Sequence, residues 1–329
     1  MSQTFFGEMP DGEPVRCIRL VSGRSSCEII TYGAAVRSLK VPSKTGEVVD
    51  VVLGYDSLDQ YRTVSGRFGA VMGRCANRIS HGRLEIDGKV YQLPLNRGEH
   101  HIHGGNTGFD KRVWSVSSVS ENSVTLWLVA RDGEEGYPGE MGVSVTYTLT
   151  EDSLRIDYLA HTDADTVCNL TNHSYFNLKG HGDVGDHEVS VLCDRYTVFG
   201  DAGIPTGEVA PVEGTRLDLR VPVLLTEVLG DDGFDQNYLT DSDHLAHAFC
   251  PESGISMDVF SDLPAVQFYT GNGIKDGTPG KDGSVYGRFS GMCFEAQYCP
   301  DSPNRPEFPS IVLKKDGEYR HFVEYRFSR

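Results

Sequence analysis

The sequence predicts an all-β protein built mainly from antiparallel strands, on three observations. Apolar and polar residues alternate with a period of two in several segments, as half-buried antiparallel strands require. Turn signals such as Asp-Gly stand between these segments and suit tight hairpins. Long amphipathic helices do not alternate with the strand patterns, which argues against a parallel α/β sheet.

Five segments carry the clearest alternation: residues 123–131, 143–150, 153–161, 255–261 and 319–327. Hairpin turns are expected at residues 86–89, 150–153 and 315–318. The first and last of these contain Asp-Gly, which accepts the positive φ of a tight turn. We therefore expect neighbouring strands to pair in sequence.

Helices are expected to be few and short, near residues 57–61 and 222–229. The 37 glycines and 15 prolines suit many turns, and they are spread along the chain and not gathered in a linker. Residues 1–329 are therefore expected to form one domain, a size that β-sandwiches reach. The glycine-rich stretch 271–287 lacks the phosphate-loop pattern and is expected to be a long surface loop near the functional site.

The chain is acidic, with 30 Lys and Arg against 47 Asp and Glu and a formal net charge of -17. This charge repels phosphate backbones and anionic bilayers, so neither nucleic acid nor a membrane is an expected partner.

The first residues lack the basic and apolar regions of a secretory signal, and a cytoplasmic location is expected. The eight cysteines form no CxxC pair, and reduced thiols are expected.

Two residues are candidates for proton transfer. His173 lies among amide and hydroxyl side chains at an expected strand end, NLTNHSYFNL, and imidazole exchanges a proton near neutral pH. The alternative is a histidine that is buried in the core, has its hydrogen bonds satisfied and takes no part in function. Glu295 follows Met292, Cys293 and Phe294, and a carboxylate is costly to bury there without a purpose or a partner. An outward-facing strand glutamate is the alternative for Glu295.

Three further clusters hold polar groups. His101 and His103 would share one face of an extended chain and could bind a metal, but no HExxH motif or Cys/His array completes a zinc site, so a metal-free site is favoured. Gly104 and Gly105 are expected to bring the backbone close to a ligand, with His103 at the lip of the turn. Residues 73–79 and 233–237 fit either solvated surface or a ligand site.

Six segments, taken in this order, resemble the aldose 1-epimerase (mutarotase) family. They are GRCANRI (73–79), HGGNTGFDKRVW (103–114), TNHSYFNL (171–178), GFDQNY (233–238), VQFYTGN (266–272) and FEAQYCPDSPN (294–304). Ser302 stands where the family more often has alanine, and Cys299 lies in a stretch that varies; neither touches a reacting group. The resemblance implies a large antiparallel β-sandwich, the galactose-mutarotase-like supersandwich.

The resemblance also implies an isomerase that interconverts the α and β anomers of free hexoses such as galactose and glucose, without a cofactor or a metal. It makes His173 the general acid at the ring oxygen and Glu295 the general base at the anomeric hydroxyl. An imidazolium and a carboxylate coexist close to neutral pH, which suits these roles. Further implied roles are assistance to catalysis by His103 and Arg78, and sugar binding by Asn77, Asp235 and Gln267.

Three alternatives stay open at this point. A hexose-phosphate 1-epimerase would need a cationic pocket, which no segment clearly marks. A non-catalytic carbohydrate-binding protein of the same fold would lack the acid and base. Metal-dependent hydrolysis through His101 and His103 is the third. An aromatic side chain is expected to stack on the sugar, and Trp114, Trp127 and the many Tyr and Phe residues all remain candidates.

Overall fold

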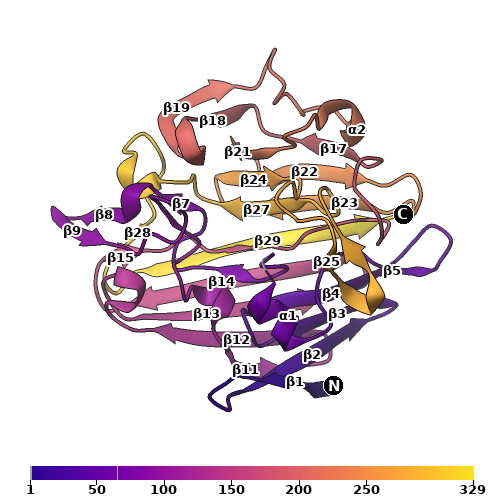
Figure 1. Ribbon diagram of the computed structural model, residues 1–329, viewed down its shortest axis with the longest axis horizontal. Coiled ribbons are helices and arrows are strands. Elements are labelled where there is room, and N and C mark those ends of the chain that lie inside the picture. Colours follow the sequence, from indigo (N-terminus) through magenta and orange to yellow (C-terminus); the bar gives the residue numbers. More distant parts are fainter. Residues whose placement is uncertain (1, 65) are drawn as a thin grey trace.

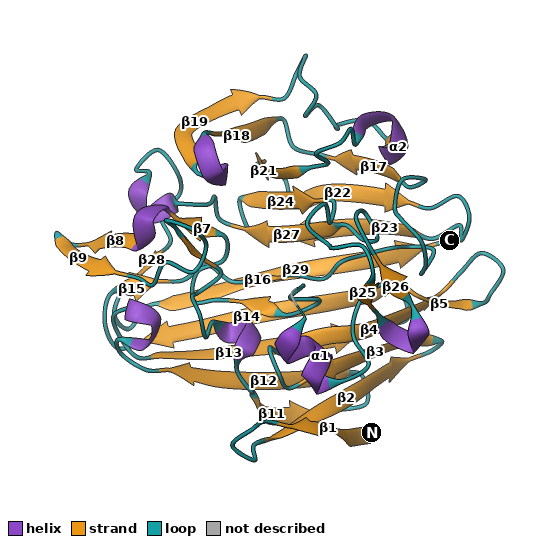
Figure 2. Cartoon of the chain, viewed as in Figure 1, coloured by secondary structure: helices purple, strands orange, loops and turns teal. Residues whose placement is uncertain are grey.

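The computed structural model describes residues 2–64 and 66–329, and strands dominate it (Figure 2). The two α-helices are short: α1 (Leu58–Thr63) and α2 (Leu225–Val228). Single 3-10 turns occur at η1 (Ser80–Gly82), η2 (Phe109–Lys111), η3 (Glu134–Gly136), η4 (Asp201–Gly203), η5 (Lys281–Gly283) and η6 (Ser302–Asn304). The strands pair antiparallel within every sheet, so the predicted all-β antiparallel class is confirmed.

The largest sheet has nine strands, which run side by side across the molecule with β29 near the middle (Figure 1). In spatial order they are β11 (Ser115–Val119), β12 (Ser123–Ala130), β13 (Met141–Leu149), β14 (Ser153–Thr162), β29 (Glu318–Ser328), β23 (Ser256–Ser261), β22 (His244–Phe249), β17 (Glu188–Val191) and β20 (Val223–Leu224). Pairing in sequence holds from β11 to β14 and then fails, because the C-terminal strand β29 inserts between β14 and β23.

Two five-stranded sheets complete the main architecture. The first, in spatial order, contains β1 (Ser2–Glu8), β2 (Pro14–Ser22), β3 (Ser25–Ile30), β4 (Ala35–Pro42) and β5 (Val48–Asp50). The second contains β19 (Pro205–Pro211), β18 (Arg195–Phe199), β21 (Asp235–Leu239), β24 (Ala265–Tyr269) and β27 (Cys293–Gln297).

The remaining strands form short antiparallel pairs. These are β6 (Val71–Met72) with β16 (Thr171–Asn172), β7 (Arg78–Ile79) with β10 (His101–Ile102), β8 (Arg83–Ile86) with β9 (Lys89–Gln92), β15 (Thr166–Val167) with β28 (Val312–Leu313), and β25 (Thr278–Pro279) with β26 (Val285–Tyr286). The β7/β10 pair contributes residues that line the cavity described below. The β6/β16 pair ends directly before another residue that lines this cavity.

Period-two alternation buries one face of the nine-stranded sheet. A row of paired residues crosses five of its strands, and each member is at most 2% exposed: Val124, Tyr147, Ile156, Val323 and Ser261. Because successive side chains point to opposite faces, this register places the apolar members of every strand on the same side. The alternation in the sequence therefore translates directly into a buried face.

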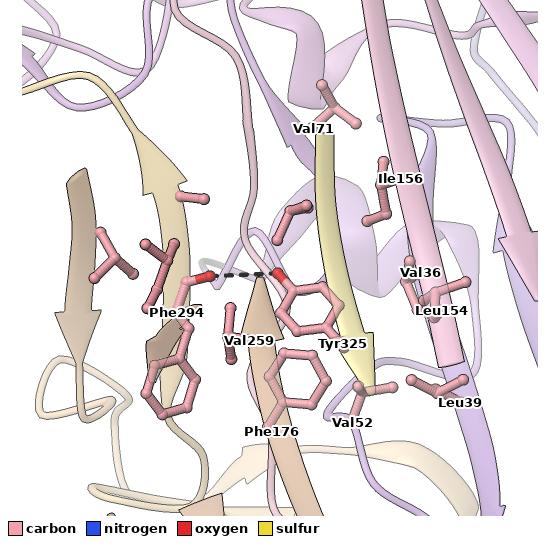
Figure 3. Packing of buried hydrophobic residues seen from close by; sticks show 14 of the residues in the cluster. Val36, Leu39, Val52, Val71, Leu154, Ile156, Phe176, Val259, Phe294 and Tyr325 are labelled. Carbon is pink, nitrogen blue, oxygen red and sulfur yellow. Dashed lines mark hydrogen bonds between the residues drawn. The ribbon is translucent and has the colours of Figure 1, made fainter. Parts of the chain in front are cut away.

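That buried face packs against the two five-stranded sheets, whose apolar residues join it in one core cluster. On one half, β2 and β3 lie against β12 and β13. On the other half, Phe294 of β27 packs near Val259 of β23 and Tyr325 of β29 (Figure 3). The Tyr325 hydroxyl donates a hydrogen bond to the Phe294 carbonyl oxygen at 3.3 Å. Sheet on sheet packing of this kind is a β-sandwich, as the resemblance implied.

The predicted turns form, although one of them joins no hairpin. Asp87 and Gly88, at φ values of 49° and 77°, link β8 to β9, and residues 150–153 link β13 to β14. Asp316 also has a positive φ of 59°, but β28 before it pairs with β15 and not with β29. A turn signal thus fixes the local backbone, whereas the partner of each strand depends on the whole sheet.

The helix predictions are confirmed in one case and partly in the other. Helix α1 begins after Ser57, whose side chain and that of Gln60 form a reciprocal capping box. Helix α2 is shorter than expected because Val223 and Leu224 form strand β20 at the sheet edge. The stretch 271–287 is not a plain loop, since it contains the β25/β26 pair and buries Tyr286 against Phe68.

All eight cysteines are buried and unpaired. None of the helices formed by residues 2–64 and 66–329 is long and apolar enough to cross a lipid bilayer.

Candidate active site

The register of β21, β24 and β27 builds a polar platform on one face of their sheet. Asn237, Gln267 and Glu295 are paired across the three strands and form one row. Asp235 and Tyr269 lie in the next row on the same face, two positions along each strand. The intervening residues, among them Phe268 and Phe294, point into the core. A carboxylate is therefore held on a rigid strand while its neighbours supply the packing.

His173 is placed opposite this platform by backbone pairing. It follows β16, and its N–H donates to the Ala70 carbonyl at 2.9 Å while its own carbonyl accepts from Gly69 at 2.9 Å. Asn172 steadies the same turn, because its amide donates to the Gly69 carbonyl and its oxygen accepts from the Ser174 hydroxyl. Asn172 and Ser174, the amide and hydroxyl neighbours of His173 in the sequence, therefore stabilise the backbone on either side of it.

Buried neighbours orient the imidazole ring itself. The ring stacks on Tyr175 with centroids 4.9 Å apart and planes 16° apart. Its Nδ1 lies 3.5 Å from Sγ of Cys293, and burial raises the pKa of that thiol well above its usual value, so the S–H group is available as a weak donor. The opposite nitrogen, Nε2, lies 3.6 Å from Oε1 of Glu295. The acid and base candidates thus face each other, and both side chains are almost fully buried, at 7% and 3% exposure.

Burial decides how this pair holds its protons. It lowers the pKa of His173 to about 3, and the positive charge of Arg67 adds to the effect. It raises the pKa of Glu295 well above its usual value, with the negative charge of Asp235 adding and Arg67 opposing. The resting site therefore favours a neutral imidazole beside a carboxylic acid. The sequence-based expectation of an imidazolium beside a carboxylate differs because it took no account of desolvation.

His103 is the third titratable side chain of the site. The β10/β7 pairing brings it to Asn77, where the His103 N–H donates to the Asn77 carbonyl at 3.0 Å. The Asn77 N–H in turn donates to Nδ1 of His103 at 3.2 Å. Since Nδ1 accepts a hydrogen bond, the proton of the neutral ring sits on Nε2. Burial, and then the charges of Arg67 and other nearby groups, lowers the pKa of His103 well below its usual value. His103 is therefore a neutral hydrogen-bond donor.

These side chains surround a cavity of about 150 Å³. Since ~10–15 Å³ of such space admits one water molecule, this cavity has room for a ligand the size of one sugar ring. All of the residues predicted from sequence line it: Asn77, Arg78, His103, His173, Asp235, Gln267 and Glu295. The structure thus brings together segments that are more than 200 residues apart in the chain, as Asn77 and Glu295 are. The catalytic and binding roles of these residues remain predictions.

Polar atoms of the site are left for a ligand. Asp235 accepts a hydrogen bond from the Gln267 amide at 2.6 Å. Oε1 of Gln267 and Oε2 of Glu295 are buried and have no hydrogen-bond partner within the described part of the protein. Buried polar atoms are nearly always hydrogen-bonded, so unpartnered ones in a cavity point to a polar, hydroxyl-bearing ligand.

The cavity has further lining residues that the sequence reasoning did not select. They are Arg67, Arg97, Ile102, Tyr175, Phe199, Gly203 and Tyr269. Tyr175 and Tyr269 follow His173 and Gln267 by two positions, so period-two alternation could have found them. Nothing in the sequence around Arg67 and Arg97 distinguishes them from surface arginines. The two tryptophans are excluded as stacking partners, because neither Trp114, buried in the core, nor Trp127, exposed on β12, lines the cavity.

Backbone strain is concentrated at this site. Arg67, Asn77 and His103 all have positive φ values, of 52°, 59° and 52°, in the left-handed region that side chains usually avoid. Such conformations persist only where the surrounding structure holds them, and they cluster at functional sites. The turn after His103 requires glycine for a steric reason, since a Cβ at Gly104 would lie 1.7 Å from the Gly73 carbonyl oxygen. The residue at position 104 therefore has to be glycine because the backbone of Gly73 lies so close.

The alternative of a metal pair formed by His101 and His103 finds no support at His101. Both ring nitrogens of His101 are engaged, Nδ1 with the Pro94 carbonyl at 2.8 Å and Nε2 with the Tyr137 hydroxyl at 2.7 Å. Among the described residues, the group that could hold a cation is His103, His173 and Glu295, whose ligand atoms lie within 4.8 Å of one another. Two of these residues, His173 and Glu295, are the candidates for acid and base.

Comparison with known proteins agrees with this geometry. Residues 16–326 match the model of the family described as aldose 1-epimerase. The chain is 45% identical to the galactose mutarotase of Mus musculus, over 100% of this chain and 98% of the relative. It is 42% identical to the galactose mutarotase of Homo sapiens over the same shares. The crystal structure of an aldose epimerase homologue from C. elegans superposes with a TM-score of 0.91 at 28% identity, covering 95% of this chain and 98% of that one. With a family match over nearly its whole length and relatives above 40% identity, this chain belongs to the aldose 1-epimerase family.

Proposed function

We propose that this isomerase interconverts the α and β anomers of free hexoses such as galactose and glucose, and that His173 and Glu295 carry the proton transfers. The observation that carries the assignment is the buried pair, with Nε2 and Oε1 3.6 Å apart in a cavity the size of one sugar ring. A non-catalytic carbohydrate-binding protein of the same fold would have no use for a desolvated acid and base that face each other.

The reaction requires two proton movements and one broken bond. Glu295, as a carboxylate, removes the proton of the anomeric hydroxyl O1, and His173, as an imidazolium, donates a proton to the ring oxygen O5. The C1–O5 bond then breaks and leaves an open-chain aldehyde. Rotation about C1–C2 presents the other face of the aldehyde, and ring closure returns both protons along the same routes. The two residues exchange the roles of acid and base between opening and closing.

The protonation state of the resting site fits this cycle. The pair holds one proton in either arrangement, so moving it from Glu295 to His173 leaves the net charge of the cavity unchanged. Ring opening converts the charged arrangement into a carboxylic acid and a neutral imidazole, which is the arrangement that burial favours. Desolvation thus favours the products of the ring-opening proton transfers over the ion pair that begins them.

Neighbouring groups are assigned to binding and charge stabilisation. Nε2–H of His103 and the guanidinium of Arg78 are donors for ring hydroxyls and for charge that develops on oxygen. Asn77, Asp235 and Gln267 hold the remaining hydroxyls, and Tyr175 and Tyr269 supply aromatic faces for the sugar ring.

Polarimetry tests the proposed function. We expect the protein to accelerate the change in optical rotation of freshly dissolved α-D-galactose or α-D-glucose, with a first-order rate that increases linearly with enzyme concentration. The buffer must contain neither imidazole nor phosphate, since both are general acid–base catalysts of mutarotation. A rate equal to that of the buffer alone at every enzyme concentration would refute the proposed activity. Loss of activity on adding a chelator would instead favour the metal-dependent alternative.

The pH dependence of kcat/KM follows from the two displaced pKa values. Because burial lowers the pKa of His173 to about 3, a second proton reaches the pair only in strong acid, and activity should persist well below the ordinary imidazole range. Because the pKa of Glu295 is raised, the single proton leaves the pair only above the usual carboxyl range. We expect activity to persist below the usual carboxyl range and to be lost in strong acid and at alkaline pH. An acid-side loss of activity within the usual carboxyl range, at about pH 4.3, would contradict the buried pair.

A further inference from the structure

Strand β27 presents two side chains to the imidazole ring of His173. Cys293 and Glu295 are two positions apart on this strand, so both point to the same face of the sheet. Sγ of Cys293 lies 3.5 Å from Nδ1 of His173, and Oε1 of Glu295 lies 3.6 Å from Nε2. One strand therefore contacts both ring nitrogens, whereas the proposed function uses only the contact with Glu295.

The backbone at Cys293 is held firmly in its sheet. Its register partner on the neighbouring strand is Tyr269 of β24. The carbonyl of the next residue, Phe294, accepts the hydrogen bond from Tyr325 on β29. The side chain of Cys293 is fully buried. The thiol is therefore fixed against the ring of His173 by the strand that carries it.

The aromatic contact of His173 fixes the plane of its ring but leaves two orientations within that plane. The ring lies against Tyr175, with the two planes 16° apart. A half-turn about χ2 keeps this plane and exchanges Nδ1 with Cδ2 and Nε2 with Cε1. Polar partners at the ring edges have to select one of the two orientations. Among the described residues, Sγ of Cys293 is the one side-chain atom in hydrogen-bond contact with Nδ1.

The proposed proton transfers require one particular tautomer of neutral His173. Nε2 faces Glu295 and gives its proton to the ring oxygen, so Nε2 is unprotonated once the sugar ring has opened. The neutral imidazole then keeps its remaining proton on Nδ1. A thiol offers sulfur lone pairs as well as its S–H group, so Sγ of Cys293 can accept a weak hydrogen bond from this Nδ1–H.

A neutral thiol suits this position because it orients the ring without making it more basic. A carboxylate beside Nδ1 would stabilise the imidazolium, as an opposite charge does. Burial raises the pKa of the Cys293 thiol well above its usual value, and the negative charge of Glu295 adds to this effect, so the sulfur stays uncharged. Burial and then Arg67 lower the pKa of His173 to about 3, against the opposing effect of its own backbone carbonyl. A strongly acidic imidazolium suits the protonation of a ring oxygen, which is itself a weak base.

From this geometry we propose that Cys293 is a positioning residue: Sγ accepts the Nδ1–H of His173 and thereby keeps Nε2 directed at Glu295 and at the ring oxygen of the sugar. The inference rests on the proposed function and adds a residue to it. Cys293 does not line the cavity, so it acts through His173 and not on the sugar. The alternative is a thiol that only fills space, since Cys293 packs in an apolar cluster with Leu53 and Phe68.

Two substitutions separate positioning from packing. Cys293→Ala removes the sulfur, whereas Cys293→Ser keeps an atom that can accept a hydrogen bond from Nδ1. We expect Cys293→Ala to lower kcat for galactose by about tenfold, the upper end of the effect of one neutral hydrogen bond. KM should change by no more than about twofold, because no contact with the sugar is lost. Cys293→Ser should restore most of kcat.

A packing role predicts the opposite order of the two variants. A hydroxyl group among apolar side chains costs more than a methyl group, so Cys293→Ser should then be both slower and less stable to heat than Cys293→Ala. A higher kcat in Cys293→Ser than in Cys293→Ala supports positioning, and the reverse order or a wild-type kcat in Cys293→Ala overturns it. Cys250→Ala is the matched control, because Cys250 is also fully buried and lies outside the cavity lining. Its kcat should equal that of the wild type.

The tautomer of His173 can be measured without any turnover, by ¹⁵N NMR of protein labelled at its histidine nitrogens. The chain has 11 histidines, and the signals of His173 are those that disappear in His173→Asn. At neutral pH we expect a protonated Nδ1 and an unprotonated Nε2 in the wild type, and shifts that move toward the average of the two tautomers in Cys293→Ala. A wild-type ring with its proton on Nε2 would overturn the proposal.

These results are distinguishable from failure of the proposed function. If the wild type accelerates mutarotation but the kcat order or the tautomer is contrary to expectation, Cys293 loses its role and the proposed function stands. If the wild type does not accelerate mutarotation at all, the proposed function itself is overturned.

Discussion

Replacing Glu295 with glutamine is expected to lower kcat for galactose by about 10² to 10⁴-fold, the usual contribution of one positioned general base. The amide has the shape of the carboxylic acid but cannot take the O1 proton. KM should change less, because Oε2 of Glu295 has no partner in the described part of the protein and the amide can still donate or accept a hydrogen bond from a hydroxyl. Polarimetry at saturating galactose measures the effect.

Thermal unfolding separates a chemical effect of Glu295→Gln from a folding defect. A carboxyl group that is 3% exposed is costly to keep in the core, so the glutamine variant should melt at the same temperature as the wild type or above it. Glu121→Gln, on an exposed turn residue, is the matched control and should retain full activity. Near-wild-type kcat in Glu295→Gln would remove Glu295 from the role of base.

Replacing His173 with asparagine is expected to lower kcat by a similar factor, about 10² to 10⁴, because the ring oxygen then leaves without a proton donor. Asparagine keeps a polar group near Sγ of Cys293 but has no titratable nitrogen to place opposite Glu295. His161→Asn, at a histidine that is 57% exposed, serves as the control. The backbone pairing of His173 with Gly69 and Ala70 does not involve its side chain, so the fold should persist.

The double variant distinguishes a cooperating pair from two independent residues. If His173 and Glu295 act together as acid and base in a single ring-opening step, removing both should cost little more than removing either one. Independent contributions would multiply, and the double variant would then be slower by about 10⁴ to 10⁸-fold, the product of the single effects. A multiplied loss would contradict the joint action of the acid and the base in one step.

Much of the fold could be predicted from the sequence because strands are defined locally. Alternation at 143–150 and 153–161 corresponds to β13 and β14, and the turn between them forms where it was expected. Which strand lies next to β14 could not be read in the same way. The partner is β29, at the far end of the chain, and that choice depends on closing a sheet over a common core, a non-local condition.

The candidate site, like the fold, could be predicted from the sequence only in part. The residue types of His173 and Glu295, with the motifs around them, were sufficient to propose an acid and a base. Their separation of 3.6 Å depends on β27 and the turn after β16 meeting across the cavity, which no spacing in the sequence encodes. The protonation state was misjudged for the same reason, since burial is a property of the folded molecule. Arg67 and Arg97 were missed because isolated arginines carry no local signal.

By itself, the sequence determined that this protein is an antiparallel β-sandwich of the aldose 1-epimerase family and which two side chains were the candidates for proton transfer. Only the tertiary structure decided that these side chains face each other out of water, that both ring nitrogens of His101 are engaged elsewhere, and that Arg67 and Arg97 line the sugar-sized cavity. The physical reason is that alternation and motifs are properties of neighbouring residues, whereas burial, pKa and the meeting of distant charges depend on which surfaces the fold brings together.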